Sequence, residues 1–381
     1  MKVAIDARAF GWPGLGRYTR SLLASLSRTP VGHEYVVLLP RADRAEFETF
    51  RRQHLLHDRF SVVAVEGEYY SVKEQTVFWR QAEAVKADLF HFTHFNVPML
   101  FRKPYVVTIH DATRFLFPGQ IQQSLLKQFV YELVFARAVV RARAVICVSK
   151  TTREELERLP LKLPRPSVIY EGVDEQFFQP VSATHKAKVR ALIGSRDPFV
   201  LYVGVWMSHK NLPRLLTAFS QVREHMPQLK LVLIGKPRPR YINMVKLVQR
   251  FGITKHVVFP GFVPEELLPA LYAESVCLLL PSLYEGFGLP ALEAAAAGAP
   301  VITSNVAGSA EIMEGAARLV NPEYVPGIVR ALKHIVTDSA VRERLIAQGK
   351  ERAQQFSWDD CARATLEVYA KAQKSERTPL R

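Results

Sequence analysis

Short apolar runs alternate with helix-like segments along the whole sequence, and this alternation limits the folds that the chain can adopt. In the N-terminal half the apolar runs cover residues 2–5, 35–39, 61–65, 89–92, 105–109 and 144–148. In the C-terminal half they cover residues 199–204, 230–235, 257–259, 276–280, 299–302 and 317–320. Apolar runs of this length predict strands buried on both faces, and intervening helices make such strands parallel. The sequence therefore predicts an α/β fold with two doubly wound parallel sheets.

A polar, proline-containing stretch separates the two halves and marks the domain boundary. The 381 residues are enough for two α/β domains, since a domain commonly has roughly 150 residues. We expect an N-terminal Rossmann-like domain over residues 1–172, an interdomain linker over residues 173–196 and a C-terminal Rossmann-like domain over residues 197–356. Residues 357–381 are expected to form a last helix, with Ser357 as its N-cap, and a tail.

A glycine-rich loop that carries two acids follows one of the predicted strands of the second half. Gly286 and Gly288 allow the backbone to approach a ligand, and Pro290 predicts the first residue of a helix whose N–H groups would face a phosphate. Open α/β sheets bind ligands at the carboxyl ends of their strands. Because carboxylates repel phosphate and bind hydroxyl groups, Glu285 on the loop and Glu293 in the first helical turn predict a nucleotide-sugar site.

The same segment resembles the glutamate-seven-glutamate signature of the family-4 retaining glycosyltransferases. The matching stretch runs over residues 281–290 and continues with Glu293, Gly298, Pro300 and Ser304. The resemblance covers nearly the whole chain. It implies the GT-B architecture, in which two Rossmann-like domains with parallel sheets face a central cleft and a last helix crosses back to the N-terminal domain.

The resemblance also implies roles for individual residues. It makes Glu285, Lys210 and His110 the expected catalytic residues. The donor is expected to contact Glu293, Gly286, Phe287, Gly288, Leu289, Gly204 and His209.

Lys210 is the expected counter-ion of the leaving diphosphate, whose departure adds negative charge in a desolvated site. In the resembling family an arginine shares this task, directly after the glycine that corresponds to Gly204. Val205 occupies that position here. We therefore expect Lys210 to act without the usual arginine, with His209 or Arg214 as a substitute.

The turn after the first strand is a candidate phosphate or acceptor loop, with Gly14 and Gly16 as its candidate residues. It lacks the six-residue dinucleotide fingerprint, and no acid ends the second strand, which disfavours a nicotinamide enzyme. The resemblance places such a loop against the donor phosphate and the acceptor.

Polar residues follow two further strands of the N-terminal half. The resemblance implies that His110 lies beside the transferred sugar, and Asp111 belongs to the same loop. His91, His94 and Asn96 are expected on the acceptor side, with His94 as the candidate residue. Because no third ligand is identifiable, their spacing does not predict a metal site.

The charge of the chain is +15, with 51 basic and 36 acidic residues, and it is unevenly distributed. Residues 101–150 hold eight Lys or Arg and two acids, an excess of +6. The apolar, basic segment 124–140 predicts a helix that could lie on an anionic membrane surface. The alternative is a core helix whose basic side chains reach solvent. No zinc-finger or RNP signature is present, so a nucleic-acid partner is not expected.

The sequence favours a cytoplasmic protein, peripheral at most on the inner face of the plasma membrane. It shows no signal peptide and no apolar stretch of the length that a spanning helix needs. The three cysteines are scattered, which predicts neither a disulfide framework nor a zinc site.

The resemblance implies a retaining and metal-independent reaction. Together with the sequence features it predicts a hexosyltransferase that needs no cofactor besides its nucleotide-sugar donor. The acceptor would be a hydroxyl of a glycan or lipid-linked glycan. No carboxylate nucleophile is evident, which favours front-face substitution within an ion pair. The pattern around residues 71–75, His94 and His110 resembles bacterial mannosyltransferases of polysaccharide and O-antigen assembly and favours GDP-mannose.

Several alternatives stay open at this point. The enzyme could use a UDP-sugar, or it could be another GT-B enzyme, such as an epimerase or a pyridoxal-phosphate-dependent phosphorylase. The chain could also be a non-catalytic subunit that binds a nucleotide or a glycan.

Overall fold

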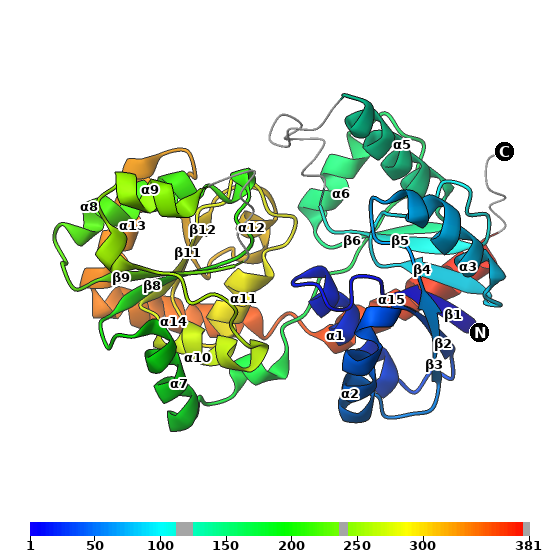
Figure 1. Ribbon diagram of the computed structural model, residues 1–381, viewed down its shortest axis with the longest axis horizontal. Coiled ribbons are helices and arrows are strands. Elements are labelled where there is room, and N and C mark those ends of the chain that lie inside the picture. The colour runs from blue at the N-terminus through cyan, green and yellow to red at the C-terminus, as the bar shows by residue number, and fades with distance from the viewer. Residues whose placement is uncertain (112–124, 236–242, 376–381) are drawn as a thin grey trace. The chain divides into compact units, whose positions relative to one another are not determined.

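The chain folds into two compact α/β units, each built on one parallel sheet (Figure 1). The computed structural model describes residues 1–111, 125–235 and 243–375. Among these, the residues up to Gly172 and from Ser357 onward form the first unit, and those from Val173 to Phe356 form the second.

The sheet of the first unit has the strand order β3-β2-β1-β4-β5-β6-β7. Its strands are β1 (Lys2–Asp6), β2 (Glu34–Pro40), β3 (Phe60–Val65), β4 (Leu89–Phe92), β5 (Tyr105–Ile109), β6 (Ala144–Cys147) and β7 (Ser167–Val168). Its helices include α1 (Leu15–Arg28), α2 (Arg44–His54), α3 (Trp79–Ala84), α5 (Leu125–Arg141), α6 (Lys150–Glu157) and α15 (Trp358–Lys374). The strand order reverses between β1 and β4, which makes a topological switch point there.

The sheet of the second unit has the strand order β10-β9-β8-β11-β12-β13. Its strands are β8 (Phe199–Val203), β9 (Lys230–Ile234), β10 (Val257–Val258), β11 (Cys277–Leu280), β12 (Val301–Ser304) and β13 (Arg318–Val320). Its α-helices are α7 (Ala183–Ile193), α8 (Leu212–Arg223), α9 (Met244–Arg250), α10 (Leu268–Glu274), α11 (Leu289–Ala296), α12 (Ala307–Ile312), α13 (Val325–Thr337) and α14 (Ser339–Ala353). Here the switch point lies between β8 and β11.

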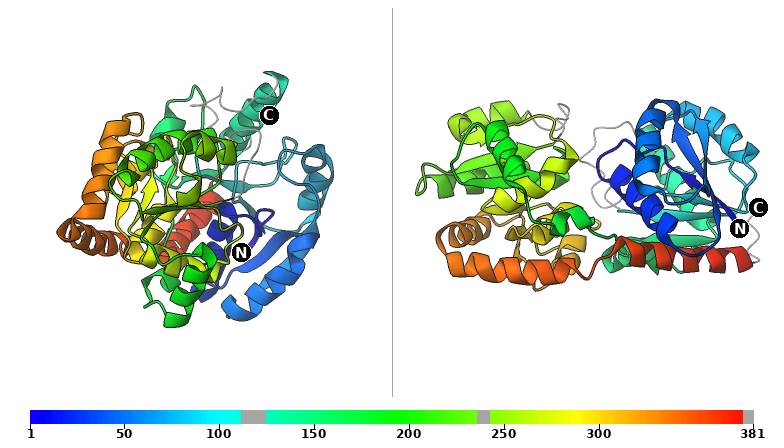
Figure 2. Two further views of the ribbon diagram at one scale, coloured as in Figure 1. Left: turned by 60° about the vertical axis from the view of Figure 1, so that its left-hand side comes forward. Right: turned by 90° about the horizontal axis from the view of Figure 1, so that it is seen from below.

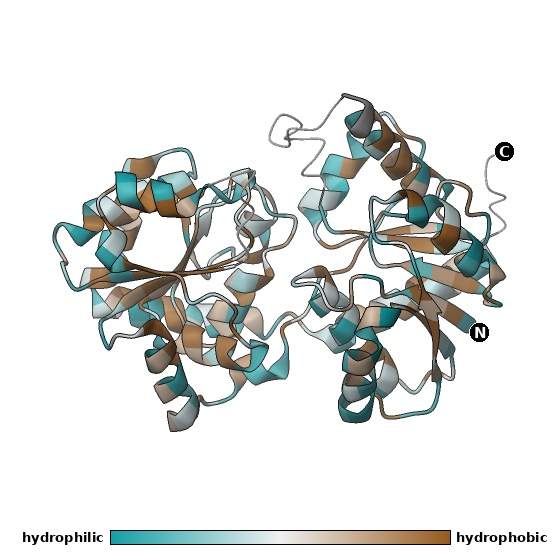
Figure 3. Cartoon of the chain, in the orientation of Figure 1, coloured by the Kyte–Doolittle hydropathy of each residue, from teal (hydrophilic) through white to brown (hydrophobic). Residues whose placement is uncertain are grey.

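Each sheet is covered on both faces, which is why its strands are continuously apolar (Figure 3). Every residue of β5 and of β11 is buried. The twelve predicted strands are all present, so the prediction of two Rossmann-like parallel sheets is confirmed. The short strand β7 was not predicted, because two residues carry no periodic signal.

The segment predicted as a linker, residues 173–196, contains a helix and belongs to the second unit. Ser182 caps α7 by accepting a hydrogen bond from the His185 N–H, and Gly194 ends the helix in a left-handed conformation with φ 68°. The helix packs against α10. The polar composition of this segment therefore did not predict the helix α7.

The last helix, α15, packs against α1 within the first unit, as Figure 2 shows with α15 in red and α1 in blue. Its N-cap is the predicted residue, since Ser357 Oγ accepts hydrogen bonds from the N–H groups of Asp359 and Asp360. Gly172 lies where this helix begins, and a Cβ there would be 2.2 Å from the Trp358 nitrogen.

His91 joins β4 to α15 and is completely buried. Its Nδ1 lies 2.6 Å from the Tyr369 hydroxyl, and its Nε2 lies 2.8 Å from Thr108 Oγ1. The expectation that His91 faces an acceptor is therefore wrong, because the packed helix covers it. Burial, with His110 as a second cause, lowers the pKa of His91 to about 3.

This burial predicts a specific acid sensitivity. Unfolded His91 takes up a proton below pH 6.5, but the folded protein does not until about pH 3. The contribution of neutral His91 to the free energy of unfolding is therefore fully present above pH 6.5. On acidification below that pH it falls by about 1.4 kcal/mol per pH unit. Between pH 7 and pH 5, we expect the unfolding free energy of His91→Gln, measured with urea, to fall by about 2 kcal/mol less than that of wild type. The exposed-site variant His57→Gln should behave like wild type, and equal slopes for all three proteins would contradict the assignment.

Candidate functional site

The loops that follow β8 and β11 meet at the switch point of the second sheet. The loop after β8 contains a 3-10 helix, Ser208–Lys210, and leads into α8. The loop after β11 contains the glycine-rich segment and leads into α11. Strands β8 and β11 are hydrogen-bonded neighbours, so their carboxyl ends bring both loops together.

An ion pair between Lys210 and Glu285 connects these two loops. The Lys210 Nζ lies 2.7 Å from each carboxylate oxygen of Glu285, and Ser282 Oγ donates a hydrogen bond of 2.8 Å to Oε1. The two charged side chains are 16% and 15% exposed. Two of the predicted catalytic residues are therefore in contact, and an ammonium group has a third N–H for another acceptor.

Asn211 fastens the loop after β8 to its surroundings. Its backbone is left-handed, with φ 59° and ψ 32°, which an asparagine tolerates better than most residues. Its buried Nδ2 donates hydrogen bonds of 2.8 Å to the Pro281 carbonyl and 2.7 Å to the Pro322 carbonyl. The Leu283 N–H also donates to the His209 carbonyl at 2.7 Å. Sequence analysis missed Asn211, and its only local signal is an asparagine directly before a helix.

The position of Glu293 differs from the prediction. Gly288 adopts a left-handed conformation, with φ 101°, and the helix α11 begins at Leu289. Glu293 is therefore the fifth helical residue and lies beyond the first turn. It is only 2% exposed, and the Tyr272 hydroxyl donates a hydrogen bond of 3.0 Å to its Oε2. The carboxylate lies beneath the loop rather than on its surface.

The loops pack backbone against backbone where glycine permits it. The Gly308 N–H donates to the Glu285 carbonyl at 2.9 Å, and a Cβ at Gly308 would lie 2.2 Å from the Gly286 oxygen. A Cβ at Gly235 would lie 1.9 Å from the Gly204 oxygen. Sequence analysis missed Gly308 and Gly235, because the partner of each glycine is distant in the chain.

The other predicted donor residues lie on the same two loops. Gly204 directly follows β8, and its N–H donates to the Ile234 carbonyl at 3.0 Å. His209 precedes Lys210 in the 3-10 helix. Phe287 is buried, with its ring centroid 5.9 Å from that of Phe356. The structure thus gathers the predicted donor residues at one edge of the sheet.

The position of the missing arginine is occupied by Val205, whose carbonyl accepts a hydrogen bond of 3.3 Å from the Tyr202 hydroxyl. A second cation nevertheless lies close by. The Arg214 Nη1 donates a hydrogen bond of 3.0 Å to the Oδ1 of Asn211, the residue that follows Lys210 in the chain. This hydrogen bond ties Arg214 to the loop that also carries His209, so both predicted substitutes belong to the surroundings of Lys210.

The switch point of the first sheet contains a buried charge cluster that sequence analysis did not find. Arg8 lies between two carboxylates, with Nη2 2.8 Å from Asp6 Oδ2 and Nη1 2.7 Å from Glu74 Oε1. Its Nη2 also donates to the Asn96 carbonyl at 2.8 Å. Burial lowers the pKa of Arg8, but Asp6, Tyr69 and Glu74 together raise it above its ordinary value. Burial also raises the pKa of Glu74, although Arg8 opposes this.

His94, the predicted acceptor-side residue, lies beside this cluster. Its ring centroid is 5.2 Å from that of Tyr69 and 6.2 Å from that of Tyr70. Tyr70 is exposed and has a positive φ of 65°, and its N–H donates to Glu74 Oε2 at 3.0 Å. Burial, followed by the influence of His110, lowers the pKa of His94 to about 3. The aromatic surface near His94 is thus held in place by a buried carboxylate.

Both ring nitrogens of His110 have partners within the first unit. Its Nδ1 lies 2.9 Å from Glu171 Oε1, and its Nε2 lies 2.9 Å from the Thr93 carbonyl. Both ring nitrogens of His110 are therefore engaged by other groups of the first unit. Neither ring nitrogen remains for a sugar hydroxyl in this conformation. Asp111 follows His110 at the surface.

The two glycines of the first loop have different environments. Gly14 is exposed, has a φ of 75° and precedes α1 as its N-cap. Gly16 is buried, and a Cβ there would lie 2.4 Å from the Phe10 carbonyl oxygen. The requirement for glycine at position 16 therefore comes from packing, whereas Gly14 lies where a ligand can reach it.

The described part of the chain holds neither a cluster of metal ligands nor a membrane-crossing helix. Within residues 1–111, 125–235 and 243–375, no three His, Cys, Asp or Glu side chains are grouped as metal ligands. No helix in those ranges combines the length and the apolar character that crossing a bilayer requires.

Comparisons with known proteins match both units. Residues 12–177 match the family described as Glycosyltransferase Family 4, and residues 184–352 match Glycosyl transferases group 1. The chain is 29% identical to an uncharacterized glycosyltransferase of Methanocaldococcus jannaschii, over 93% of this chain and 94% of that one. It is 24% identical to O-antigen chain mannosyltransferase B of Escherichia coli, over 97% of this chain and 99% of that protein. Its fold is similar to that of Anabaena HepE in complex with UDP-glucose, with a TM-score of 0.78, 19% identity and coverage of 97% and 99%.

The Lys210–Glu285 pair predicts an energetic coupling that can be measured without any substrate. We expect a double-mutant cycle of Lys210→Met and Glu285→Gln, measured by urea unfolding, to give a coupling energy of about 1–3 kcal/mol. The coupling is expected because both charges are largely desolvated. A matched cycle on the Lys230–Asp197 pair, which is 3.7 Å apart and more exposed, should give less than about 1 kcal/mol. Equal coupling in the two cycles would contradict a special role for the buried pair.

Proposed function

The chain belongs to the glycosyltransferases, as its two family matches describe them, and on that premise we propose that it transfers a hexose with retention. It has the GT-B fold, with two Rossmann-like parallel-sheet units. The donor would be a nucleoside-diphosphate sugar and the acceptor a hydroxyl of a glycan or lipid-linked glycan. The observation that carries this proposal is the Lys210–Glu285 pair at the switch point of the second sheet.

The proposed donor contacts divide between the two acids and the loop. Glu285, on the loop, would hold hydroxyls of the transferred sugar, and Glu293 would hold the ribose after a rearrangement that exposes its carboxylate. The diphosphate would lie at the N-terminus of α11, near Gly288, where the positive end of the helix dipole favours an anion. The third N–H of Lys210 can reach a phosphate oxygen while the other two stay on Glu285.

The proposed reaction is a front-face substitution. The bond between the sugar C1 and the phosphate oxygen breaks, and the acceptor oxygen bonds to C1 on the same face. The acceptor proton passes to the departing phosphate oxygen, so no protein nucleophile or metal is needed. Lys210 and Arg214 would balance the charge that builds on the diphosphate.

Mannose, from GDP-mannose, is the proposed hexose. This is supported by the near-complete overlap with an O-antigen chain mannosyltransferase of Escherichia coli. The alternative is a UDP-sugar, which Anabaena HepE binds in a structure of the same fold. A non-catalytic role is disfavoured, because Lys210, Glu285 and Glu293 are all present at one sheet edge.

Removing the Lys210 ammonium should test the chemical role. With donor and acceptor present, we expect Lys210→Ala to lower single-turnover transfer on the order of 100-fold, which is typical for one strong electrostatic partner. Sugar transfer to the acceptor is compared between GDP-mannose and UDP-glucose, which identifies the donor. Nuclear magnetic resonance of the product anomer identifies the stereochemistry. Lys230→Ala, at an ion pair away from this loop, is the control. A loss below threefold for Lys210→Ala would contradict the proposed role.

We also propose that α5 contacts an anionic membrane surface that carries the acceptor. Phe129 is 62% exposed and Leu133 is 42% exposed on this helix. Near its C-terminal end, Arg141 lines a cavity of about 180 Å³ with Arg102, Lys103 and Arg143. The residues 112–124 of the basic region, and the side chain of Lys127, lie outside the described part of the chain. Apolar side chains beside basic ones are typical of interfacial helices.

Vesicle sedimentation tests this surface. Wild type should sediment with anionic but not zwitterionic vesicles, and 1 M salt should release it as the Debye length falls from about 10 Å to about 3 Å. The variant Phe129→Ser/Leu133→Ser should bind at least tenfold more weakly. A matched variant at exposed apolar residues elsewhere in the first unit, Leu56→Ser/Val72→Ser, should bind like wild type. Equal binding by all three proteins would rule out α5 as the contact surface.

A further inference from the structure

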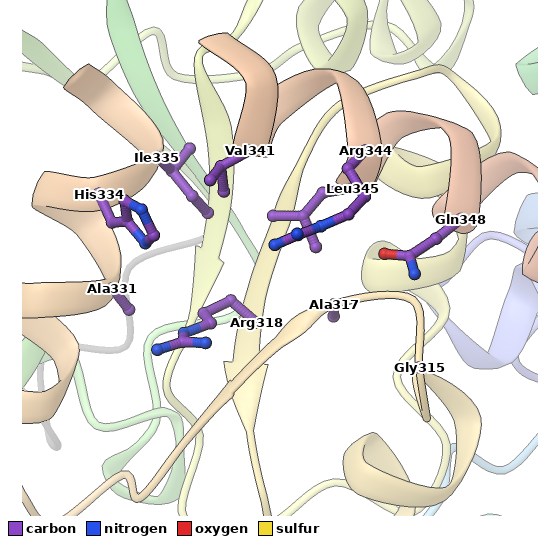
Figure 4. Close-up of a pocket in the computed structure, with 10 residues that line it drawn as sticks. All are labelled: Gly315, Ala317, Arg318, Ala331, His334, Ile335, Val341, Arg344, Leu345 and Gln348. Carbon is purple, nitrogen blue, oxygen red and sulfur yellow. The ribbon is translucent and has the colours of Figure 1, made fainter. Parts of the chain in front are cut away.

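A cavity of about 330 Å³ lies at the outer edge of the second sheet, away from the candidate donor loops. It is bounded by β13, α13 and α14 (Figure 4). Two arginines, Arg318 on β13 and Arg344 on α14, direct their guanidinium groups into it. The amide of Gln348 lies beside them, and Ile335 and Leu345 form part of an apolar wall.

Within the described part of the chain, the two arginines of the cavity, unlike the other two arginines of α14, have no hydrogen-bond or ion-pair partner. Arg342 donates to the Ile335 carbonyl at 2.8 Å, and Arg352 donates to the Ile312 carbonyl at 2.9 Å. Among the residues that the structure describes, Arg318 and Arg344 have no hydrogen bond and no ion pair. Asp338, at the start of α14, pairs with the lining residue His334 at 3.5 Å. Two like charges thus face one space without a counter-ion.

We infer that this cavity binds a small phosphate monoester with a sugar-sized body. Two guanidinium groups can each bind phosphate oxygens through paired N–H donors, which gives strong and directional contacts. The Gln348 amide can bind hydroxyl groups, and the apolar wall suits the C–H face of a sugar ring. The volume is at the small end of the range for ligand pockets, about 300–1,000 Å³, which fits one monosaccharide phosphate.

The cavity is separate from the candidate donor site but lies behind it. Helix α13 packs against α8, which begins just after Lys210, and α14 packs against α11, which begins after Gly288. At Gly349 of α14, an added Cβ would lie 3.2 Å from the Ala295 Cβ of α11. None of the residues that line the cavity contributes to the Lys210–Glu285 pair. The inference therefore does not depend on the proposed function.

Calorimetry with glucose 6-phosphate as the probe tests the inference. We expect wild type to bind it with millimolar or tighter affinity at low ionic strength, and Arg318→Gln/Arg344→Gln to bind at least tenfold more weakly. The control Arg330→Gln/Lys333→Gln removes the same charge from α13 outside the cavity and should change affinity less than twofold. All these side chains are exposed, so circular dichroism should show each variant folded.

The donor loops also attract phosphates, so the same titration is run on Lys210→Ala. Unchanged affinity in Lys210→Ala, together with the loss in Arg318→Gln/Arg344→Gln, supports the cavity as the site. Three results would overturn the inference: no binding to wild type, full binding to Arg318→Gln/Arg344→Gln, or a loss of binding in Lys210→Ala. None of them bears on whether the enzyme transfers a sugar, which the Lys210→Ala turnover measurement decides.

Discussion

The ion pair between Lys210 and Glu285 is the interaction on which the candidate site depends. Two charges that are about 85% removed from water are stable only when their remaining hydrogen-bonding capacity is met. Ser282 supplies a donor to Glu285, and Asn211 holds the lysine loop through two carbonyls of neighbouring segments. The glycine at position 308 lets another backbone segment reach the Glu285 carbonyl. These contacts, together with the hydrogen bond from the Leu283 N–H to the His209 carbonyl, therefore fix the distance between the two loops.

Each sheet has a cationic side chain at its topological switch point: Arg8 in the first unit, which is buried, and Lys210 in the second, which is partly buried. The two side chains differ in their hydrogen-bonding capacity. Arg8 is enclosed by Asp6, Glu74 and the Asn96 carbonyl, so its guanidinium holds the first sheet's loops together. Lys210 contacts one carboxylate and keeps a donor and some exposure. A group with spare hydrogen-bonding capacity can meet a substrate, whereas a fully satisfied one gives a rigid support. On this argument Arg8 supports the aromatic surface beside His94, whereas Lys210 keeps the capacity to meet the donor that the proposed function requires.

The sequence predicted the sheets and the loops but not the contacts that shape them. Continuous apolar runs located the strands, and glycines and acids after those strands located the donor loop. Lys210 and Glu285 are 75 residues apart, and their contact follows only when β8 and β11 are known to be neighbours. Glu74 lies 66 residues from Arg8, and no local pattern links them. The helix begins one residue before the predicted Pro290, because the left-handed Gly288 is its N-cap, so Glu293 is the fifth helical residue and lies just beyond the first turn.

The replacement of the usual arginine by Val205 changes the charge balance of the proposed reaction. Lys210 and Glu285 are neutral as a pair, so they add no net positive charge to meet a departing diphosphate. Arg214 restores one charge, but its hydrogen bond to Asn211 directs it first to the loop and only secondarily to a ligand. On the proposed mechanism, the remaining contribution would come from the N-terminus of α11, whose dipole favours an anion. Gly288, the N-cap of this helix, therefore contributes to leaving-group stabilisation on the proposed mechanism together with Lys210.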